Sequence, residues 1–571
     1  MTGRSRRDPK AGRHADPTRE VLISVSADLS TGHEDVTARL RYGPEPTADD
    51  TARVADVCVI GSGASGAITA WALQRAGLDV VIVEQGPFVD PWVSYDDVET
   101  IAETAWIRQD SGVWEKSGNP WSTCNVGGGT VFFGGAAFRY RPVDFDAEAR
   151  LGRSDLPLRW PWTVEEIDPY YALVESALGI AGGGHDPSLP SDPAYPMPPV
   201  ETTVEGAVIA AAARSLGLNP FPTPLAIASE PYQGRLACAG KRPCISNRCD
   251  RGAKGDAVTV FLDPARKAGL RLFAGLKAVR LLRRDAISVD GVECVRVDNG
   301  NRHVIRARHV VVAGNAIQSA ALLLRSTDDL SPQGLGNDHD MVGRGLCFKM
   351  SGYVQGYRRT DVPTTSREDR VAGPGPFSTA AITDYYTADD APGGLGGLII
   401  ESQPEESLRL RPDEQIIRLE CLVPDQPRAD NRVTLGRGVD RFGLPDVVMD
   451  YSPHPRDRAR LEYLQRRAEE ILRAAGCELT WRESSYFWMG STHLHGTCRA
   501  GTNPRTSVTD PDGRVHGLTN LMVVDGGVMP YPGGVNPTLT IQSLALRMAH
   551  QLLRREFGIE SGFSSPPVGT E

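Results

Sequence analysis

The sequence predicts a protein of mixed α/β and α+β class, in which a discontinuous α/β domain carries an inserted α+β domain. First, strand-and-helix units typical of a doubly wound sheet lie at three separate places, in residues 54–84, 304–324 and 521–553. Second, residues 350–480 differ in character, because they combine short β-like runs with one long charged helix. Third, a chain of 571 residues is too long for one simple hydrophobic core.

The first unit has the pattern of a Rossmann-type β-α-β element. Val54–Ile60 is a short β-rich run before a glycine-rich turn, and Ala64–Ala76 has a helical pattern. Gly77 stands where a helix C-terminal cap is expected. A second buried-strand pattern, Val80–Val83, ends at the acidic residue Glu84. The order strand, turn, helix, strand therefore predicts a parallel pair joined by a helix.

Later elements extend both domains. In the middle of the chain, the strand Val304–Ala313 leads into an apolar helix, Ala316–Leu324. Near the end, the strand Leu521–Val524 leads through a turn-rich loop into a helix from about Pro537 to Leu553. The inserted domain is expected to be an antiparallel sheet with helices. Its predicted elements are the strands Gly396–Ile400 and Ile416–Leu422 and the helix Arg456–Ala475.

These elements divide the chain into two domains and two tails. The predicted boundaries are 53–155, 225–345 and 485–558 for the α/β domain, 156–224 and 346–484 for the inserted domain, 1–52 for a polar N-terminal tail and 559–571 for a C-terminal tail.

The composition fits an ordered globular protein and disfavours two classes of partner. Hydrophobic residues make up 40% of the chain and charged residues 23%. A net charge of −10 argues against a nucleic-acid partner and against attraction to anionic membranes, but is compatible with a cationic substrate. The chain has no apolar run of about 18 residues, so we expect no membrane insertion and predict a cytoplasmic protein.

A glycine motif in the first unit predicts a dinucleotide-binding turn. Gly61, Gly63 and Gly66 are spaced G-x-G-x-x-G between strand and helix. Gly61 permits the tight turn, Gly63 lets the backbone approach a pyrophosphate, and Gly66 allows close contact between helix and strand. Glu84 is placed to accept hydrogen bonds from a ribose. The motif alone does not distinguish FAD from NAD.

Glycine-rich and polar motifs follow in order along the rest of the chain. They are Asn125–Thr130 with Gly134, Gly135, Arg139 and Arg141–Phe145; Arg308–Ala316 with Leu322–Leu324; His493 with Gly496–Arg499, Ser507, Val508, Asn520, Leu521 and Val524–Gly526; and Asn536–Thr540. These blocks resemble the glucose-methanol-choline (GMC) oxidoreductases. The resemblance covers the cofactor-binding portions from about residue 54 to 555 and does not extend to the inserted domain.

The resemblance implies a GMC fold that binds FAD. Some members attach the flavin to a histidine in the glycine-rich segment, but residues 130–133 here contain none, so we expect non-covalent FAD. Asp525 and Gly526 are expected near the diphosphate and ribityl chain, and Val279 is expected to supply a backbone contact to the adenine. The expected FAD-binding residues are Gly61, Gly63, Ser65, Gly66, Glu84, Gly128, Gly129, Thr130, Val279, Gly314, Asp525, Gly526, Asn536, Pro537 and Thr538.

Two residues of the C-terminal blocks are the expected catalytic groups. His493 occupies the place of the histidine that faces the flavin in the GMC family, and an imidazole suits removal of a hydroxyl proton near neutral pH. Asn536 occupies the partner position, where its amide would stabilise developing alkoxide character. His495 is the competing candidate, since residues two apart in an extended segment point the same way. A purely structural role for both histidines stays open.

A cluster of three cysteines leaves alternatives open. Cys238, Cys244 and Cys249 precede a segment that resembles the gluconate- and glucose-dehydrogenase-like branch of the family, some of whose members hold an iron–sulfur cluster on similar cysteines. The spacing departs from that pattern, and Asp250 follows the last cysteine. A disulfide or free thiols fit at least as well, and a zinc site lacks a fourth ligand.

The motifs together predict an FAD-dependent oxidoreductase that takes hydride from an alcohol on a carbohydrate-like small molecule. An amino sugar of aminoglycoside biosynthesis, oxidised at a primary hydroxyl, is the specific hypothesis, with O₂ or another acceptor receiving the electrons. The alternatives are a dehydrogenase of neutral sugars that relays electrons through an iron–sulfur cluster, a flavin monooxygenase or NAD(P)-linked flavin reductase, and a flavin-binding protein without catalysis. A second nucleotide-binding glycine motif, which a reductase would need, does not stand out.

Overall fold

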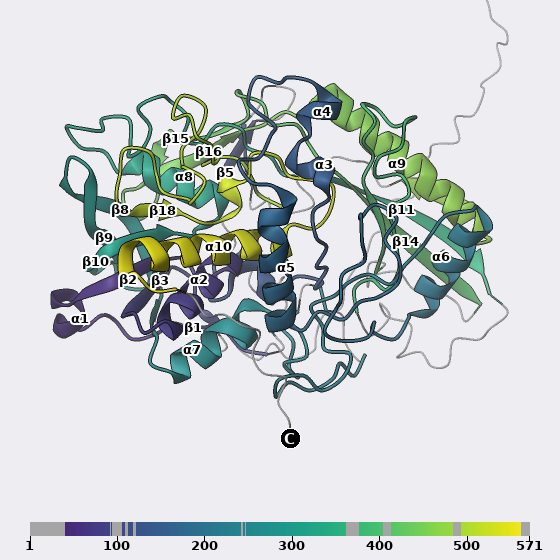
Figure 1. Ribbon diagram of the computed structural model, residues 1–571, viewed down its shortest axis with the longest axis horizontal. Helices are drawn as coiled ribbons and strands as arrows, with labels where there is room; N and C mark the ends of the chain where they lie inside the picture. Colours follow the sequence, from purple (N-terminus) through teal and green to yellow (C-terminus); the bar gives the residue numbers. More distant parts are fainter. Residues whose placement is uncertain are drawn as a thin grey trace, which may run out of the picture.

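Two sheets that lie side by side dominate the computed structural model of the protein (Figure 1). The structure describes residues 40–91, 93, 105–108, 112, 114–117, 122–240, 244–245, 247–360, 376–403, 413–482 and 493–560.

The first is a seven-stranded sheet in the order β7-β3-β2-β10-β9-β8, with β18 paired to β10. Its strands are β2 (Val54–Ile60), β3 (Val80–Glu84), β7 (Arg271–Ala274), β8 (Leu276–Asp285), β9 (Ser288–Arg296), β10 (Arg302–Val312) and β18 (Leu521–Val523). The strands β7, β3, β2, β10 and β18 are parallel, whereas β9 and β8 add an antiparallel edge. The apolar runs of β2 and β3 are almost wholly buried, as expected for parallel strands covered on both faces.

Helices from distant parts of the chain pack on this sheet or on one another. They are α2 (Ala64–Arg75), α5 (Val164–Leu178), α8 (Asn315–Arg325) and α10 (Thr538–Phe557), and α10 packs against both α2 and α5. Gly77 follows α2 with a φ of +91°, a left-handed conformation that favours glycine at a helix end. Short helical segments lie between the larger elements: η3 (Gly128–Val131), α3 (Pro142–Phe145), α4 (Glu148–Leu151), η4 (Val258–Leu262), α7 (Asp263–Lys267) and η6 (Gly526–Val528).

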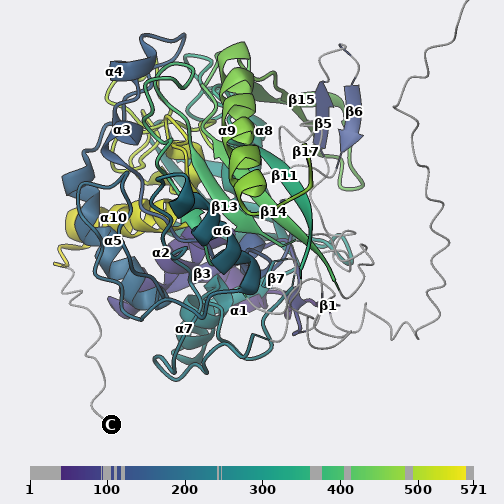
Figure 2. The same ribbon diagram turned by 90° about the vertical axis from the view of Figure 1, so that its right-hand side faces the viewer.

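The second sheet is five-stranded and antiparallel, in the order β12-β13-β14-β11-β17. Its strands are β11 (Met350–Arg359), β12 (Ala381–Ile382), β13 (Leu398–Ser402), β14 (Glu414–Val423) and β17 (Leu479–Arg482). The helices α6 (Val204–Ser215) and α9 (Pro455–Ala474) cover one face (Figure 2). Leu419 and Cys421 pack in the same cluster as α9, whereas Leu422 joins the core of the first sheet. Alternation along β14 thus turns one face toward α9 and the other toward the first domain.

The structure contains every helix and strand that the sequence predicts for these two sheets, with ends shifted by a few residues. The predicted helix Arg456–Ala475 is α9, which starts one residue earlier at Pro455, and α10 extends to Phe557. The domain boundaries themselves stay a prediction.

One sheet was not expected from the sequence. The hairpin of β5 (Ala105–Arg108) and β6 (Trp114–Ser117) joins β15 (Arg432–Val439) and β16 (Pro445–Asp450) in a four-stranded sheet, which spans both predicted domains. The parallel pairing of β16 with β5 is a long-range contact that no local pattern encodes.

The last part of the region predicted as a polar tail, residues 1–52, contains regular secondary structure. β1 (Leu40–Arg41) pairs with β4 (Phe88–Val89), and α1 (Ala48–Ala52) begins with a capping box at Thr47, which stabilises so short a helix. Residues 1–39 and most of the predicted C-terminal tail, 561–571, lie outside the described residues.

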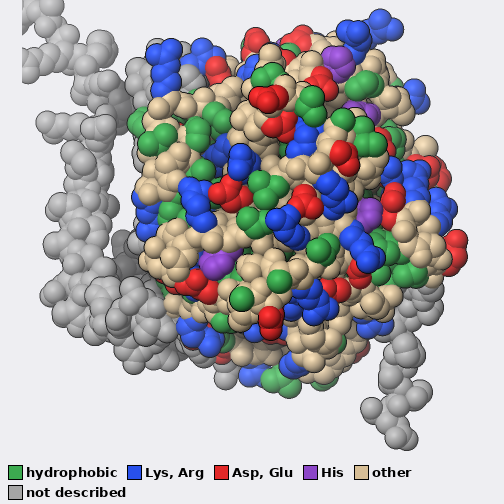
Figure 3. Space-filling model, turned by 90° about the vertical axis from the view of Figure 1, so that its left-hand side faces the viewer, with side chains coloured by type: hydrophobic (Ala, Val, Ile, Leu, Met, Phe, Trp, Pro, Cys, Tyr) green, Lys and Arg blue, Asp and Glu red, His purple; other side chains and the backbone are tan. Residues whose placement is uncertain are grey.

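The surface of the first domain carries charges of both signs. Figure 3 shows acidic and basic side chains interspersed over this face. On the antiparallel edge, Arg280 and Arg302 lie 3.2 and 2.8 Å from Glu293, so arginine charge is neutralised locally. Among the described residues, no helix combines the length and apolarity that crossing a bilayer requires.

Candidate cofactor and active site

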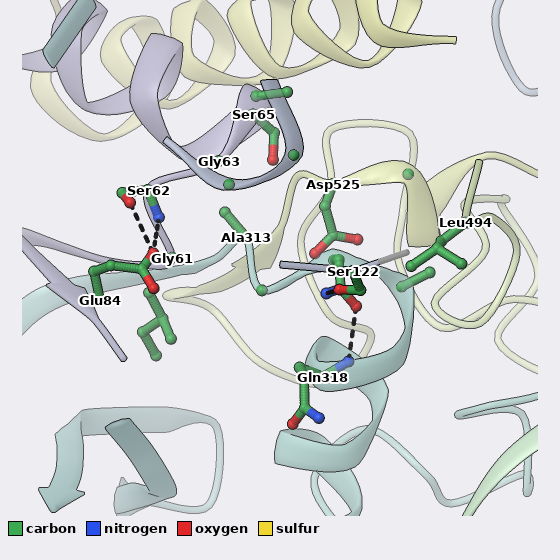
Figure 4. Close-up of a pocket in the computed structure, with 18 of the residues that line it drawn as sticks. Gly61, Ser62, Gly63, Ser65, Glu84, Ser122, Ala313, Gln318, Leu494 and Asp525 are labelled. Atoms are coloured by element: carbon green, nitrogen blue, oxygen red, sulfur yellow. Dashed lines mark hydrogen bonds between the residues drawn. The ribbon is translucent and has the colours of Figure 1, made fainter. Parts of the chain in front are cut away.

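A cavity opens at the carboxyl ends of the central parallel strands, where the Gly61–Gly63 turn of β2 meets Ala313 of β10 (Figure 4). Such a crevice is the usual ligand site of an open α/β sheet. Its lining comes from the ends of β2, β3 and β10, from the start of β8, from the first turns of α2, η3, α8 and α10, and from residues 493–494.

The glycines of the first motif serve two distinct physical purposes. A Cβ on Gly61 would lie 2.4 Å from the Ala313 oxygen, and one on Gly66 would lie 2.1 Å from the Gly61 oxygen, so both positions must be bare for the chain to pack. A Cβ on Gly63 would meet nothing nearer than the Gly128 Cα at 4.0 Å, and one on Gly129 nothing within 4 Å. A side chain at Gly63 or Gly129 would not collide with the protein but would occupy space in the cavity. These two glycines therefore leave that space open for a ligand.

The N-termini of three helices line the cavity. The first turns of α2, α8 and α10 all contribute lining residues, through Ala64 and Ser65, through Asn315 and Ala316, and through Thr538. Unpaired N–H groups and the helix dipole at such ends favour a phosphate or another anion.

Two carboxylates lie on opposite sides of the cavity (Figure 4). Glu84 accepts hydrogen bonds from the backbone and the hydroxyl of Ser62 at 2.9 and 2.7 Å, which fixes it at the end of β3. Asp525 accepts a hydrogen bond from Ser319 and one from the Gly527 backbone. Burial raises the pKa of the Asp525 carboxyl to about 6, although these two hydrogen bonds act in the opposite direction.

The structure brings most of the expected FAD-binding residues to this cavity. The lining includes Gly61, Gly63, Ser65, Glu84, Gly128, Gly129, Thr130, Gly314, Asp525, Gly526, Pro537 and Thr538. Three expected residues are not among those that line it. Gly66 packs behind the turn, Val279 is buried in β8 next to the lining residue Ala278, and Asn536 directly precedes the lining residue Pro537.

These residues fit an FAD molecule. The open space beside Gly63 and Gly129 and the helix N-termini suit a diphosphate, and the carboxylate of Glu84 suits ribose hydroxyls. The Asn125 Oδ1 is buried at the lining without a hydrogen-bond partner among the described residues, as a group awaiting a ligand donor would be.

His493 is the histidine that lines the cavity. Its Nδ1 is buried, and no hydrogen bond from a described residue reaches either ring nitrogen. Burial, and then the neighbouring Lys349 and His495, hold the pKa of His493 well below its usual value of 6.5. The ring is therefore neutral at physiological pH, which is the protonation state that a general base requires.

His495 and Asn536 are placed differently from His493. The backbone of His495 pairs with Cys347, and its Nδ1 donates to the His493 carbonyl oxygen at 2.6 Å, so the ring is fully buried behind the lining. His495 is therefore not among the residues that line the cavity, although it lies only two positions after His493. The Asn536 Oδ1 is buried without a hydrogen-bond partner among the described residues, which leaves it available to a ligand.

Two residues at or beside the cavity were not expected from the sequence. Ser62, which lies inside the glycine motif, bonds Glu84 and accepts a hydrogen bond from the Gly127 backbone at 3.1 Å. Lys349 is fully buried next to His493. Ser62 could be inferred from its place in the motif, whereas Lys349 reaches the site through tertiary contacts alone.

The three clustered cysteines are free thiols in the structure. The Lys254 ammonium donates to the carbonyl oxygens of Cys244 and Asn247 at 2.8 and 2.7 Å and so fixes this segment. Across the described residues, no group of three histidine, cysteine or acidic side chains is arranged to hold a metal ion.

Comparison with known protein families gives three matches. The two models of the GMC oxidoreductases match residues 121–351 and 427–545, and a model of FAD dependent oxidoreductases matches residues 56–92. The last match contains the glycine turn and Glu84, and the first two contain the other blocks that line the cavity.

Individual proteins are similar over almost the whole chain. The 6'''-hydroxyparomomycin C oxidase of Streptomyces lividus is 46% identical over 95% of this chain and 97% of its own. The paromamine 6'-oxidase of Streptomyces fradiae is 46% identical over 90% of this chain and 95% of its own. Among solved structures, pyridoxine 4-oxidase from Mesorbium loti shares the fold, with a TM-score of 0.63 at 18% identity over 87% of this chain and 99% of its own.

Proposed function

The chain belongs to the GMC oxidoreductase family and is an FAD-dependent oxidoreductase that acts on alcohols, and we propose that its substrate is an amino sugar of the aminoglycoside type. One observation carries the proposal: two oxidases named for hydroxyparomomycin and paromamine are 46% identical to it over 95% and 90% of this chain. The reaction proposed is oxidation of a primary hydroxyl to the aldehyde.

Two residues of the chain would remove the hydroxyl proton of the substrate and stabilise its oxygen. The alcohol loses its hydroxyl proton to His493, whose ring nitrogens have no hydrogen-bond partner among the described residues. The Asn536 amide, beside the N-terminus of α10, donates to the substrate oxygen and stabilises its developing negative charge. Bound FAD would supply the acceptor for the hydride that leaves the carbon bearing this hydroxyl group.

We further propose O₂ as the electron acceptor, because both relatives are named as oxidases. Each turnover would then release one hydrogen peroxide for each aldehyde formed. Peroxide measured in a peroxidase-coupled assay at equal yield with the aldehyde supports O₂. Turnover that requires an artificial dye acceptor would instead favour the dehydrogenase alternative.

A buried carboxyl group of the second sheet supports a cationic substrate. Glu420 of β14 is 6% exposed and pairs across strands with Tyr353, on the face directed away from α9. Burial raises the pKa of Glu420 to about 7, although Arg418 and the nearby hydroxyl groups of Tyr353 and Ser351 lower it. Glu420 is not among the residues that line the cavity, but β11, the strand opposite it, begins directly after Lys349, which neighbours His493. An ammonium group placed there would favour the ionised carboxylate.

The Glu420→Gln variant is expected to raise the KM for an amino sugar about tenfold, because the neutral amide loses the attraction to an ammonium. The KM for a neutral sugar alcohol should change much less. Steady-state kinetics with both substrates measure the difference.

The matched control is Glu401→Gln. Glu401 is an equally buried carboxyl on the α9 face of the same sheet, where it accepts hydrogen bonds from Thr203 and Thr379. The Glu401→Gln variant should leave the ratio of the KM values for the amino sugar and the neutral sugar alcohol unaltered. Equal changes for both substrates in Glu420→Gln would count against a carboxylate that recognises the amine.

A further inference from the structure

A buried lysine, Lys349, lies near both expected catalytic residues. Lys349 is 0% exposed and stands immediately before β11. Its backbone has a φ of +60°, a left-handed conformation that non-glycine residues rarely adopt. Asp425 holds this conformation by accepting hydrogen bonds from the backbone N–H groups of Phe348 and Lys349 at 3.0 and 2.8 Å. Such local strain, held by surrounding bonds, is typical of functional sites.

The ammonium group of Lys349 holds the loop that carries Asn536. It donates to the carbonyl oxygen of Val535, the residue directly before Asn536, and to the Tyr140 hydroxyl at 3.2 Å. The Tyr140 hydroxyl in turn donates to the Pro532 carbonyl oxygen at 2.6 Å. Lysine and tyrosine thus fix two carbonyl groups of one short loop that leads into the N-terminus of α10.

The same segment fixes the backbone of His493. Cys347 and His495 exchange backbone hydrogen bonds of 3.1 and 3.0 Å, which brings residues 493–495 alongside residues 347–349. The His495 ring then donates to the His493 carbonyl oxygen at 2.6 Å. Both expected catalytic residues are therefore tied, by short bonded paths, to the chain around Lys349.

We propose that Lys349 is a positioning residue of the alcohol oxidation, which holds the Asn536 loop in place and, through its positive charge, keeps His493 unprotonated. This inference rests on the proposed role of His493 as the base. A buried cation close to a histidine disfavours the imidazolium form, so His493 stays competent as a base at lower pH.

The charges around this lysine determine the sign of the effect. Burial lowers the pKa of Lys349 to about 7, whereas Asp144 and Asp425 raise it and Arg141 lowers it. The two carboxylates therefore help to retain the ammonium near neutral pH. Burial lowers the pKa of His493 most, followed by Lys349 and then His495, so removing the lysine charge should move the pKa of His493 upward.

The test compares two equally buried lysines. Lys349→Met keeps the length of the side chain but removes its charge and its donors. It is expected to retain FAD, to lower kcat at least about tenfold, and to shift the acid limb of the kcat/KM profile upward by about one pH unit. The control is Lys254→Met. Lys254 is 1% exposed and donates to the carbonyl oxygens of Phe133, Cys244 and Asn247, and it is not among the groups that lower the pKa of His493, so the acid limb should stay at its wild-type pH.

A second variant separates position from charge and covers the case in which Lys349→Met fails to fold. Lys349→Gln keeps a donor for the Val535 carbonyl but carries no charge. Its acid limb should shift upward as in Lys349→Met, with a smaller loss of kcat. An acid limb that stays at its wild-type pH in the folded variants overturns the electrostatic role, and an unchanged kcat overturns the positioning role. If His493 is not the base, the His493→Ala variant should instead keep full turnover, which distinguishes a failure of the proposed function from a failure of the role of Lys349.

Discussion

The His493→Ala variant is expected to lose about a thousandfold in kcat while it keeps its FAD. His493 lines the cavity with ring nitrogens that no described residue engages, and its lowered pKa keeps it neutral. Removal of the ring deletes the proton acceptor but leaves the glycine turn, Glu84 and the helix N-termini intact. Flavin absorbance per protein, together with kcat for the best alcohol substrate, measures both quantities on one sample.

A matched histidine gives the control for this variant. His516 is partly buried and bonds the Ser507 hydroxyl at 2.9 Å, away from the cavity lining. His516→Gln should retain both flavin and turnover. Imidazole added to His493→Ala should restore part of the lost rate, because the vacated space admits a small base. A His493→Ala enzyme with near wild-type kcat would exclude His493 as the base.

The Gly63→Glu variant is expected to fold but to bind FAD at least a hundredfold more weakly. The backbone of Gly63 has a φ of −68°, which any residue adopts, and a Cβ there meets no protein atom closer than 4.0 Å. The new carboxylate would extend into the space at the N-terminus of α2, where it competes with the diphosphate for the same N–H groups. Flavin content after purification and titration of the apoprotein with FAD measure the effect.

The Gly66→Ala variant provides the contrast. Its methyl group would lie 2.1 Å from the Gly61 oxygen, so it should destabilise the protein itself. Thermal unfolding of the two apoproteins distinguishes these effects: Gly63→Glu should melt close to the wild-type apoprotein, and Gly66→Ala well below it. A yellow Gly63→Glu protein with normal FAD affinity would contradict the placement of the diphosphate.

Local patterns predict the parts of the fold that depend on neighbouring residues in the chain. The β2-turn-α2-β3 unit follows from the glycine spacing, and the bounds of α2 differ from the expected helix by one residue, because Gly77 ends it by a local mechanism. The FAD-lining residues near Gly128 and Asp525 follow from the family resemblance, since each lies inside a contiguous motif.

Other parts depend on contacts between distant segments and were beyond sequence reasoning. The pairing of β5 with β16 and the bridge between Cys347 and His495 join residues far apart in the chain. The same bridge turns His495 away from the cavity, which the spacing of the two histidines does not reveal. Lys349 reaches His493 only because the start of β11 packs against the segment of residues 493–495.

Anaerobic mixing of the purified yellow protein with an aminoglycoside-type amino sugar that carries a primary hydroxyl tests the central claim most directly. We expect the visible flavin absorption to bleach at substrate concentrations that leave it intact with the corresponding 6-deoxy amino sugar, and one aldehyde to form per flavin. Flavin that is bleached by neutral sugars but not by any amino sugar would contradict the proposed substrate. A protein that neither contains FAD nor takes it up would contradict the account as a whole.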